Sequence, residues 1–155
     1  MTLTHISFVY SQNTLTTFGY LAEFRTVRNA VGMVTGDFNG DGVIDLATYG
    51  GTKISIHLQE ADSLSWRTFT FQSDRSLRTV LAARCNEDQL TDLITLTDEP
   101  TELRVFIAKP KDKFTVRWSM PMSWQADRYM TADIDNDGKI DLLMFGKKTL
   151  GVTVL

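Results

Sequence analysis

The chain has 155 residues, of which 43% are hydrophobic and 23% charged, and its net charge is −3. This size suits one domain that can bury a core, and a small net charge without a Lys/Arg run argues against a nucleic-acid partner. The single cysteine excludes an internal disulfide, and no apolar run reaches the length of a membrane span. Residues 1–11 lack the charged and apolar regions of a signal peptide.

Short β-branched and aromatic runs separated by turn residues predict an all-β chain. An opening hairpin is followed by two groups of four strands and then by three more, and four short strands in succession are typical of one propeller blade. The predicted strands are Leu3–Tyr10, Thr14–Tyr20, Ala30–Thr35, Val43–Tyr49, Lys53–Glu60, Trp66–Gln72, Leu77–Ala83, Leu90–Thr97, Glu102–Ala108, Phe114–Met120, Arg128–Ala132, Lys139–Phe145 and Leu150–Leu155.

The first loop with chemical character is Asp37–Leu46, called loop 1, in which Asp37 is position 1. Oxygen-bearing side chains stand at positions 1, 3, 5 and 9, and a glycine at position 6 allows the positive φ that a sharp turn around an ion needs. Together with one backbone carbonyl and water, these side chains suffice for Ca²⁺. The predicted ligands are Asp37, Asn39, Asp41, Asp45 and the carbonyl of Val43.

The same spacing recurs in Arg84–Leu93 (loop 2) and Asp133–Leu142 (loop 3), because Asp92 follows Asp45 by 47 residues and precedes Asp141 by 49. A repeat of this length indicates propeller blades or a solenoid. Loop 3 is intact and predicts a second Ca²⁺ site. Its predicted ligands are Asp133, Asp135, Asp137, Asp141 and the carbonyl of Lys139.

Loop 2 has Arg84 at position 1 and Gln89 in place of the glycine. A guanidinium can take over the electrostatic role of a cation beside the remaining oxygen ligands, or the loop has lost its metal. We expect it to be metal-free. Cys85 stands where the other loops carry Phe38 and Ile134, which predicts a buried small hydrophobe rather than a reactive thiol.

An EF-hand begins like these loops but needs a glutamate at position 12, where this chain has Thr48 and Met144. A simple turn built from Asp, Asn and Gly remains the alternative to metal binding, although a repeated spacing favours metal. Apolar residues flank the carboxylate at position 9, so each loop is predicted to run directly into a strand.

On these residues the sequence resembles the FG-GAP or VCBS-type repeat of integrin-like β-propellers, whose signature is an Asp-x-Asp/Asn-x-Asp-Gly-x-x-Asp-Leu loop between the first two strands of each blade. The match is specific in loops 1 and 3 and weak in loop 2. The resemblance implies calcium in the two intact loops, an extracellular or cell-surface location and a role in binding protein or glycan partners. It also implies a ring of six to eight blades.

The repeat divides the chain into a partial blade at 1–27, blades at 28–75 and 76–123, and a partial blade at 124–155. About three blades form an open arc whose edges invite pairing, so we expect further blades of a longer protein or other copies of the chain to complete the ring. In one version the N-terminal strand pair completes the C-terminal blade of a second copy.

Other candidate chemistry is sparse, and no nucleophile motif or phosphate-binding loop is present. His57 falls on the polar phase of its strand and is predicted to face solvent or to be loosely paired, and a catalytic role for it or for His5 would need a positioned partner that the sequence does not supply. Trp66, Trp118 and Trp124 are expected to pack between blades rather than to line a ligand site. The chain is therefore interpreted as a non-catalytic interaction module. The alternative is an accessory or casing propeller of a secreted carbohydrate-active enzyme or toxin.

Overall fold

The computed structural model describes residues 5–11, 18–60, 65–99, 101–122, 126–146 and 149–154. Within these ranges the regular secondary structure is entirely β-strand, so the all-β prediction is confirmed. Trp124 and parts of several predicted turns lie outside them. The strands are β1 (His5–Ser11), β2 (Phe18–Arg25), β3 (Gly32–Gly36), β4 (Asp45–Gly50), β5 (Lys53–Gln59), β6 (Trp66–Gln72), β7 (Leu77–Ala83), β8 (Asp92–Thr97), β9 (Glu102–Lys109), β10 (Lys113–Pro121), β11 (Arg128–Ala132), β12 (Asp141–Gly146) and β13 (Thr149–Val154).

Each sheet is an antiparallel meander, in which consecutive strands are hydrogen-bonded neighbours. Two sheets have four strands, in the orders β3-β4-β5-β6 and β7-β8-β9-β10. Strands β11, β12 and β13 form a three-stranded sheet, and β1 pairs with β2. The predicted four-stranded antiparallel groups are thus confirmed for the described residues.

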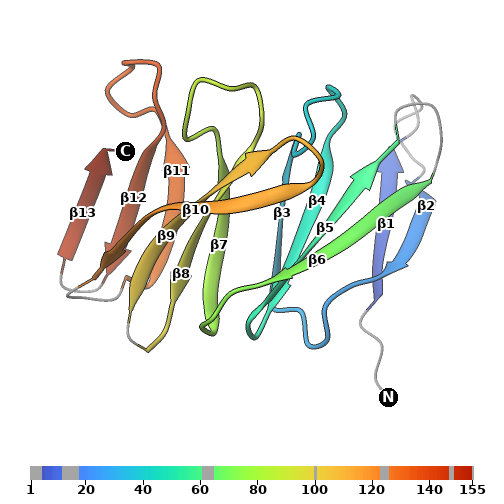
Figure 1. Cartoon of the computed structure of the whole chain (residues 1–155), viewed down its shortest axis with the longest axis horizontal. Helices are drawn as coiled ribbons and strands as arrows, with labels where there is room; N and C mark the ends of the chain where they lie inside the picture. The colour runs from blue at the N-terminus through green and yellow to red at the C-terminus, as the bar shows by residue number, and fades with distance from the viewer. Residues whose placement is uncertain are drawn as a thin grey trace.

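The sheets lie face to face in a row that follows the chain order (Figure 1). From the last strand of each sheet the chain crosses to the first strand of the next, and β7 contacts both β3 and β11. Several hydrogen bonds join neighbouring sheets; for example, the Thr91 N–H donates to the Asp37 carbonyl at 2.7 Å, and the Thr131 hydroxyl donates to the Ala82 carbonyl at 3.5 Å. The described sheets form an open row and do not close into a ring.

The first core fills the space between the two four-stranded sheets. Successive side chains of a strand point to opposite faces, so alternate residues of β4 and β5 meet the second sheet. Phe71 of β6 and Phe114 of β10 stack with ring centroids 5.1 Å apart, which closes the outer side of this core. Its buried members are Phe38, Ala47, Tyr49, Ile54, Ile56, Leu58, Leu77, Val80, Leu93 and Phe106.

The second core lies between the second four-stranded sheet and the three-stranded sheet. The inner part of the middle sheet is consequently covered on both faces, and every residue of β8 is buried, whereas the outer strand β10 is mostly exposed. A strand covered on both faces needs apolar residues in succession, which the sequence Leu93-Ile94-Thr95-Leu96 supplies. The buried members are Ala83, Ile94, Leu96, Leu103, Val105, Ile107, Ala126, Leu142 and Met144.

The second strand of each sheet begins at loop position 9, two residues later than predicted. Strands β4, β8 and β12 start at Asp45, Asp92 and Asp141. Positions 7 and 8 still belong to the loop, because side-chain acceptors at position 5 hold the N–H of position 7 (Asp41 Oδ1 to Val43 N, 2.8 Å). The alternation of apolar residues gives no sign of these side-chain hydrogen bonds, so the strand start was predicted two residues too early.

His57 is fully buried, so its predicted solvent exposure was wrong. Its partner Thr48 also contacts Thr26, which follows β2, so this face of the β3–β6 sheet is turned toward the N-terminal segment. Two threonine hydroxyls satisfy the ring: Thr48 Oγ1 lies 3.0 Å from Nε2, and Thr68 Oγ1 lies 2.9 Å from Nδ1. The polar phase of β5 is thus a buried hydrogen-bonded face, because both sides of this sheet are covered.

Burial lowers the pKa of His57 from 6.5 to about 4. Between these pH values His57 is therefore protonated in the unfolded chain but neutral in the folded chain. The unfolding free energy should fall as pH drops from 6.5 toward 4, and this group should contribute roughly 3 kcal/mol to the loss. Burial raises the pKa of Asp45 to about 6 and acts in the opposite direction. The informative measurement is therefore the difference in urea-unfolding free energy between the native protein and His57→Gln at pH 7 and pH 4.5. We expect the native protein to lose more stability than the variant, and parallel profiles would contradict this account.

Candidate metal loops

All three loops share a ladder of side-chain to backbone hydrogen bonds. The side-chain oxygen at position 3 accepts the N–H of position 5, with distances of 3.0 Å in loop 1, 2.8 Å in loop 2 and 3.2 Å in loop 3. The carboxylate at position 5 then accepts the N–H of position 7, at 2.8, 3.1 and 2.8 Å. Asn and Asp form such bonds two residues ahead, which explains why these residue types alternate here. The spacing therefore specifies a shared loop shape.

Position 1 separates the two intact loops from loop 2. Asp37 Oδ2 accepts the Gly42 N–H at 2.9 Å, and Asp133 Oδ2 accepts the Gly138 N–H at 3.0 Å. Both glycines have the positive φ that the sequence predicts, 81° and 87°. Position 4 also has positive φ, at Gly40 in loop 1 and at Asn136 in loop 3 (82° and 61°), which sequence reasoning missed although Gly and Asn favour it.

Loop 2 lacks this geometry. Arg84 supplies no acceptor at position 1, and its Nη1 contacts Gln89 Oε1 at 3.5 Å. Neither Glu87 at position 4 nor Gln89 at position 6 has positive φ. A carboxylate, a glycine and the two backbone turns found in loops 1 and 3 are all missing, so loop 2 differs from them in backbone path as well as in charge.

The aspartates at position 9 are buried and bind backbone amides on both sides. Asp45 accepts the N–H of Phe38 and of Gln59, both at 2.9 Å, and Asp92 accepts those of Cys85 and Ala108, both at 2.8 Å. Each carboxylate thereby ties position 2 of its loop to the third strand of its sheet. This structural role applies equally in loop 2, where no metal is expected, and the sequence analysis did not foresee it.

Asp141 repeats half of this arrangement. Its Oδ2 accepts the Ile134 N–H at 3.0 Å, whereas its buried Oδ1 has no hydrogen-bond partner among the described residues. The backbone position equivalent to Gln59 is Leu155, which lies outside them. The Asp141 side chain is fully buried, like Asp45 and Asp92.

Burial also changes the pKa of these carboxyl groups. Burial raises the pKa of Asp45 to about 6, against two backbone hydrogen bonds that lower it, and the nearby Asp41 and Asp37 raise it further. Burial likewise raises the pKa of Asp92. A carboxylate among other carboxylates is stabilised in its charged form by a bound cation.

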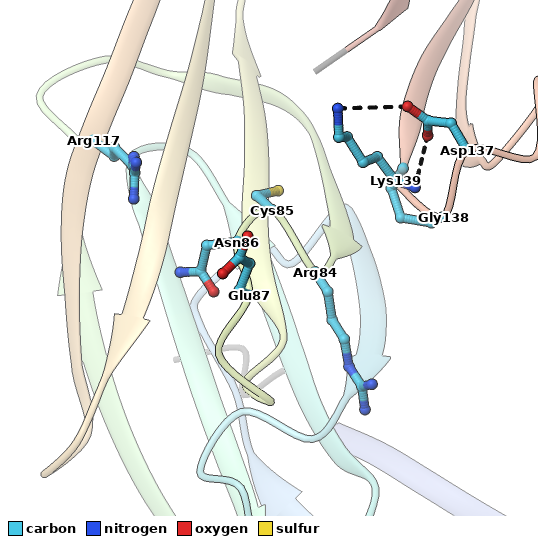
Figure 2. A pocket seen from close by; sticks show the side chains of 9 residues that line it. Arg84, Cys85, Asn86, Glu87, Arg117, Asp137, Gly138 and Lys139 are labelled. Atoms are coloured by element: carbon cyan, nitrogen blue, oxygen red, sulfur yellow. Dashed lines mark hydrogen bonds and ion pairs between the residues drawn. The ribbon is translucent and has the colours of Figure 1, made fainter.

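Three acidic side chains of loop 3 converge. Asp133, Asp135 and Asp141 each bring a carboxylate oxygen within 4.8 Å of the others. Oxygen atoms at this separation can surround one Ca²⁺, which binds its ligands at roughly 2.3 to 2.6 Å. Asp137 stands apart because its carboxylate accepts the Lys139 N–H at 2.8 Å and pairs with Lys139 Nζ at 3.5 Å (Figure 2). Three of the four side chains predicted for this site are thus grouped.

Loop 1 holds its predicted ligands in a different arrangement. Asn39 Nδ2 donates to Asp41 Oδ2 at 2.9 Å, and Asp37 Oδ1 accepts the Gly40 N–H at 2.6 Å. Among the described residues, its acidic side chains do not form a group like that of loop 3. Position 3 of loop 1 is Asn39 where loop 3 has Asp135, so loop 1 has one carboxylate fewer, although its main chain has the same positive-φ positions.

A pocket of about 680 Å³ lies between loops 2 and 3. Arg117 from β10 borders it on one side and the Lys139–Asp137 pair on the other (Figure 2). Cys85 also lines it, and burial, together with the nearby Asp92, raises its pKa to about 12, so the thiol stays protonated. This agrees with the prediction of an unreactive cysteine. The remaining lining residues are Arg84, Asn86, Glu87, Gly138 and Ile140.

The described tryptophans do not form a common site. Trp66 is half-buried on β6, but Trp118 is 41% exposed, so its expected packing between sheets is wrong. A register shift between Val116 and Trp118 interrupts the pairing of β10 with β9. An extra residue in one strand changes which face the following side chains occupy, and this explains the difference.

Comparison with known proteins adds no relative: no protein-family model matches the chain, and no curated protein matches its sequence significantly. None of the described segments is a helix long and apolar enough to cross a membrane.

Proposed function

We propose that the chain is a calcium-stabilised β-propeller segment that acts as a non-catalytic interaction module outside the cell or at its surface. The observation that carries the proposal is the convergence of Asp133, Asp135 and Asp141 at the turn between β11 and β12. Carboxylates this close repel one another unless a cation or protons neutralise them. An all-oxygen ligand set suits a hard cation such as Ca²⁺.

In loop 3 the ion would be held by Asp133, Asp135, Asp141 and the Lys139 carbonyl, and Asp137 would join by leaving the Lys139 ammonium, which is exposed to solvent. In loop 1 the corresponding ligands are Asp37, Asn39, Asp41, Asp45 and the carbonyl of Val43. The matching main-chain turns support an equivalent site there. The ion would link the exposed turn to a buried strand, so its role would be structural.

Three features support propeller blades as the architecture. The sheets are four-stranded meanders, they stack face to face, and the chain returns to the same side of the row at the start of each sheet. The strands at this side, β3, β7 and β11, are neighbours. Propeller blades share these relations, and further sheets of the same kind would be needed to close a ring.

We propose that a partner binds at the end of the module where loops 2 and 3 lie. The pocket between loops 2 and 3 carries the cations Arg84 and Arg117 beside exposed acidic groups, a mixture suited to a polar protein or glycan ligand. Calcium bound in loop 3 would coordinate the Asp137 carboxylate and break its ion pair with Lys139, so the Lys139 ammonium could then turn toward this pocket. Partner binding should then depend on calcium.

The direct test of the metal proposal is calorimetric titration of chelator-treated protein with CaCl₂. We expect about two ions per chain for the native protein and about one for Asp133→Asn/Asp135→Asn, since carboxamides bind Ca²⁺ more weakly than carboxylates. Asp88→Asn in loop 2 is the matched control and should leave the stoichiometry unchanged. Absence of calcium uptake, or loss of an ion in the Asp88 variant, would refute the assignment.

A further inference from the structure

Each of the two four-stranded sheets packs four equivalent side chains against the sheet that follows it in the chain. They come from the first strand, loop position 2 and two alternate positions of the second strand. In the first sheet they are Val34, Phe38, Ala47 and Tyr49, all in or against the first core. In the second sheet they are Leu81, Cys85, Ile94 and Leu96, all in or against the second core. The repeat thus defines a face by which one sheet receives the next.

The third sheet has the same face without a described neighbour. Its residues are Met130, Ile134, Leu143 and Phe145, and we call them the C-terminal face. Met130 is 57% exposed, and Ile134 and Phe145 are each 55% exposed, whereas the equivalent Phe38, Tyr49 and Leu96 are at most 8% exposed. The equivalents of Phe145 are buried in both earlier repeats, and those of Met130 and Ile134 are buried or half-buried, whereas all three side chains are exposed here.

At the other end of the row, the first sheet exposes apolar side chains on its opposite face. Met33 and Ile44 are 58% and 60% exposed on the face of the first sheet that is turned away from the second. Their equivalents in the second sheet, Val80 and Thr91, are 2% and 8% exposed because the preceding sheet covers them. We call Met33, Thr35 and Ile44 the N-terminal face. At this end the two-stranded β1–β2 pair takes the place of a whole sheet, and β4 and most of β5 are buried whereas Met33 and Ile44 remain exposed.

The two open faces are the two halves of one type of contact. At the internal contacts, residues equivalent to the C-terminal face meet residues equivalent to the N-terminal face: Phe38 and Val80 belong to one core, and Leu81 packs in the same core as Tyr129. Within a single row these open faces lie at opposite ends (Figure 1), so they cannot satisfy each other. In a second copy they can.

We propose that the C-terminal face of one copy docks on the N-terminal face of a second copy, in a head-to-tail contact that repeats the contact between sheets within the chain. Exposed apolar patches of this kind mark association sites, and a contact between two different faces leads to a ring if the rotation closes and to an open chain if it does not. The contact uses Met130, Ile134 and Phe145 from one copy and Met33 and Ile44 from the other. It goes beyond calcium binding and does not depend on it.

The test is the mass of the protein in solution by light scattering, for the native chain and for three lysine variants at exposed positions. The native chain should form a species of at least twice 17.5 kDa. Phe145→Lys and Met33→Lys should each weaken association by about tenfold or more, because each places a charge within the apolar contact. Val116→Lys is the matched control, since Val116 is 51% exposed on β10, outside both faces.

Mixing the two monomeric variants gives the decisive result. Phe145→Lys retains a native N-terminal face and Met33→Lys retains a native C-terminal face, so the mixture should recover one contact and form heterodimers. A monomeric native protein would overturn the proposal. Association that survives Met33→Lys would also overturn it, because that result indicates contact between two C-terminal faces. A cooperative melting transition for each variant confirms that the variants remain folded.

Discussion

Asp92→Ala should lower the unfolding free energy by about 3 kcal/mol, although no metal is expected in loop 2. The Asp92 side chain is fully buried, and its two oxygens accept the N–H groups of Cys85 and Ala108 at 2.8 Å. The substitution leaves these donors without their acceptor, at a cost of roughly 1 to 3 kcal/mol each, partly offset because the buried charge is removed as well. Urea unfolding in the presence of a chelator measures the effect.

Asp88→Ala is the control for Asp92→Ala because it removes a carboxylate from the same loop. Asp88 Oδ1 accepts the Leu90 N–H at 3.1 Å in a partly exposed position, so we expect a loss below about 1 kcal/mol. Asp92→Asn retains one acceptor and should fall between the two. Equal effects of the Asp88 and Asp92 substitutions would show that the link from the loop to β9 contributes little to stability.

The second large effect concerns calcium. Two sites that bind only the folded chain should each add about 2.7 kcal/mol to the unfolding free energy when free calcium is 100 times the dissociation constant. The native protein should therefore lose about 5 kcal/mol when a chelator is added, and Asp133→Asn/Asp135→Asn should lose about half as much. Denaturant unfolding with and without calcium provides the measurement.

Magnesium at equal concentration serves as the control for an ionic-strength effect. It requires shorter bonds and near-octahedral geometry, and should stabilise the native chain less than calcium does. An unfolding free energy that is the same with calcium and with chelator would contradict structural metal sites in both loops. An equal response to both cations would indicate nonspecific screening of the acidic loops.

The repeat made most of the strand order predictable. Because loops 1, 2 and 3 recur at nearly constant spacing, the strands between them could be placed by alternation, and the four-stranded meanders follow from short turns such as Gly50-Gly51. The positive φ of Gly42 and Gly138 was predicted from local chemistry alone. Turn chemistry and repeat spacing can be read directly from the sequence, because neither depends on which sheets pack together in the folded chain.

Features that depend on neighbouring sheets were harder to predict. His57 follows the polar phase of β5, and only the cover on that side of the sheet makes the position buried. Trp118 was misplaced because a single register shift reverses the face of a strand. The aspartates at position 9 were interpreted only as metal ligands, because their second partner, an amide on the third strand, lies 14 to 16 residues away.

Long-wavelength anomalous diffraction from crystals grown with calcium tests the central claim most directly. We predict one anomalous peak among Asp133, Asp135 and Asp141, a second among Asp37, Asn39 and Asp41, and no peak in loop 2 beside Arg84. Calcium ligands at roughly 2.3 to 2.6 Å, with the Lys139 and Val43 carbonyls among them, would complete the agreement. No peak in either intact loop at saturating calcium, or a peak at Asn86 and Asp88 in loop 2, would contradict the account.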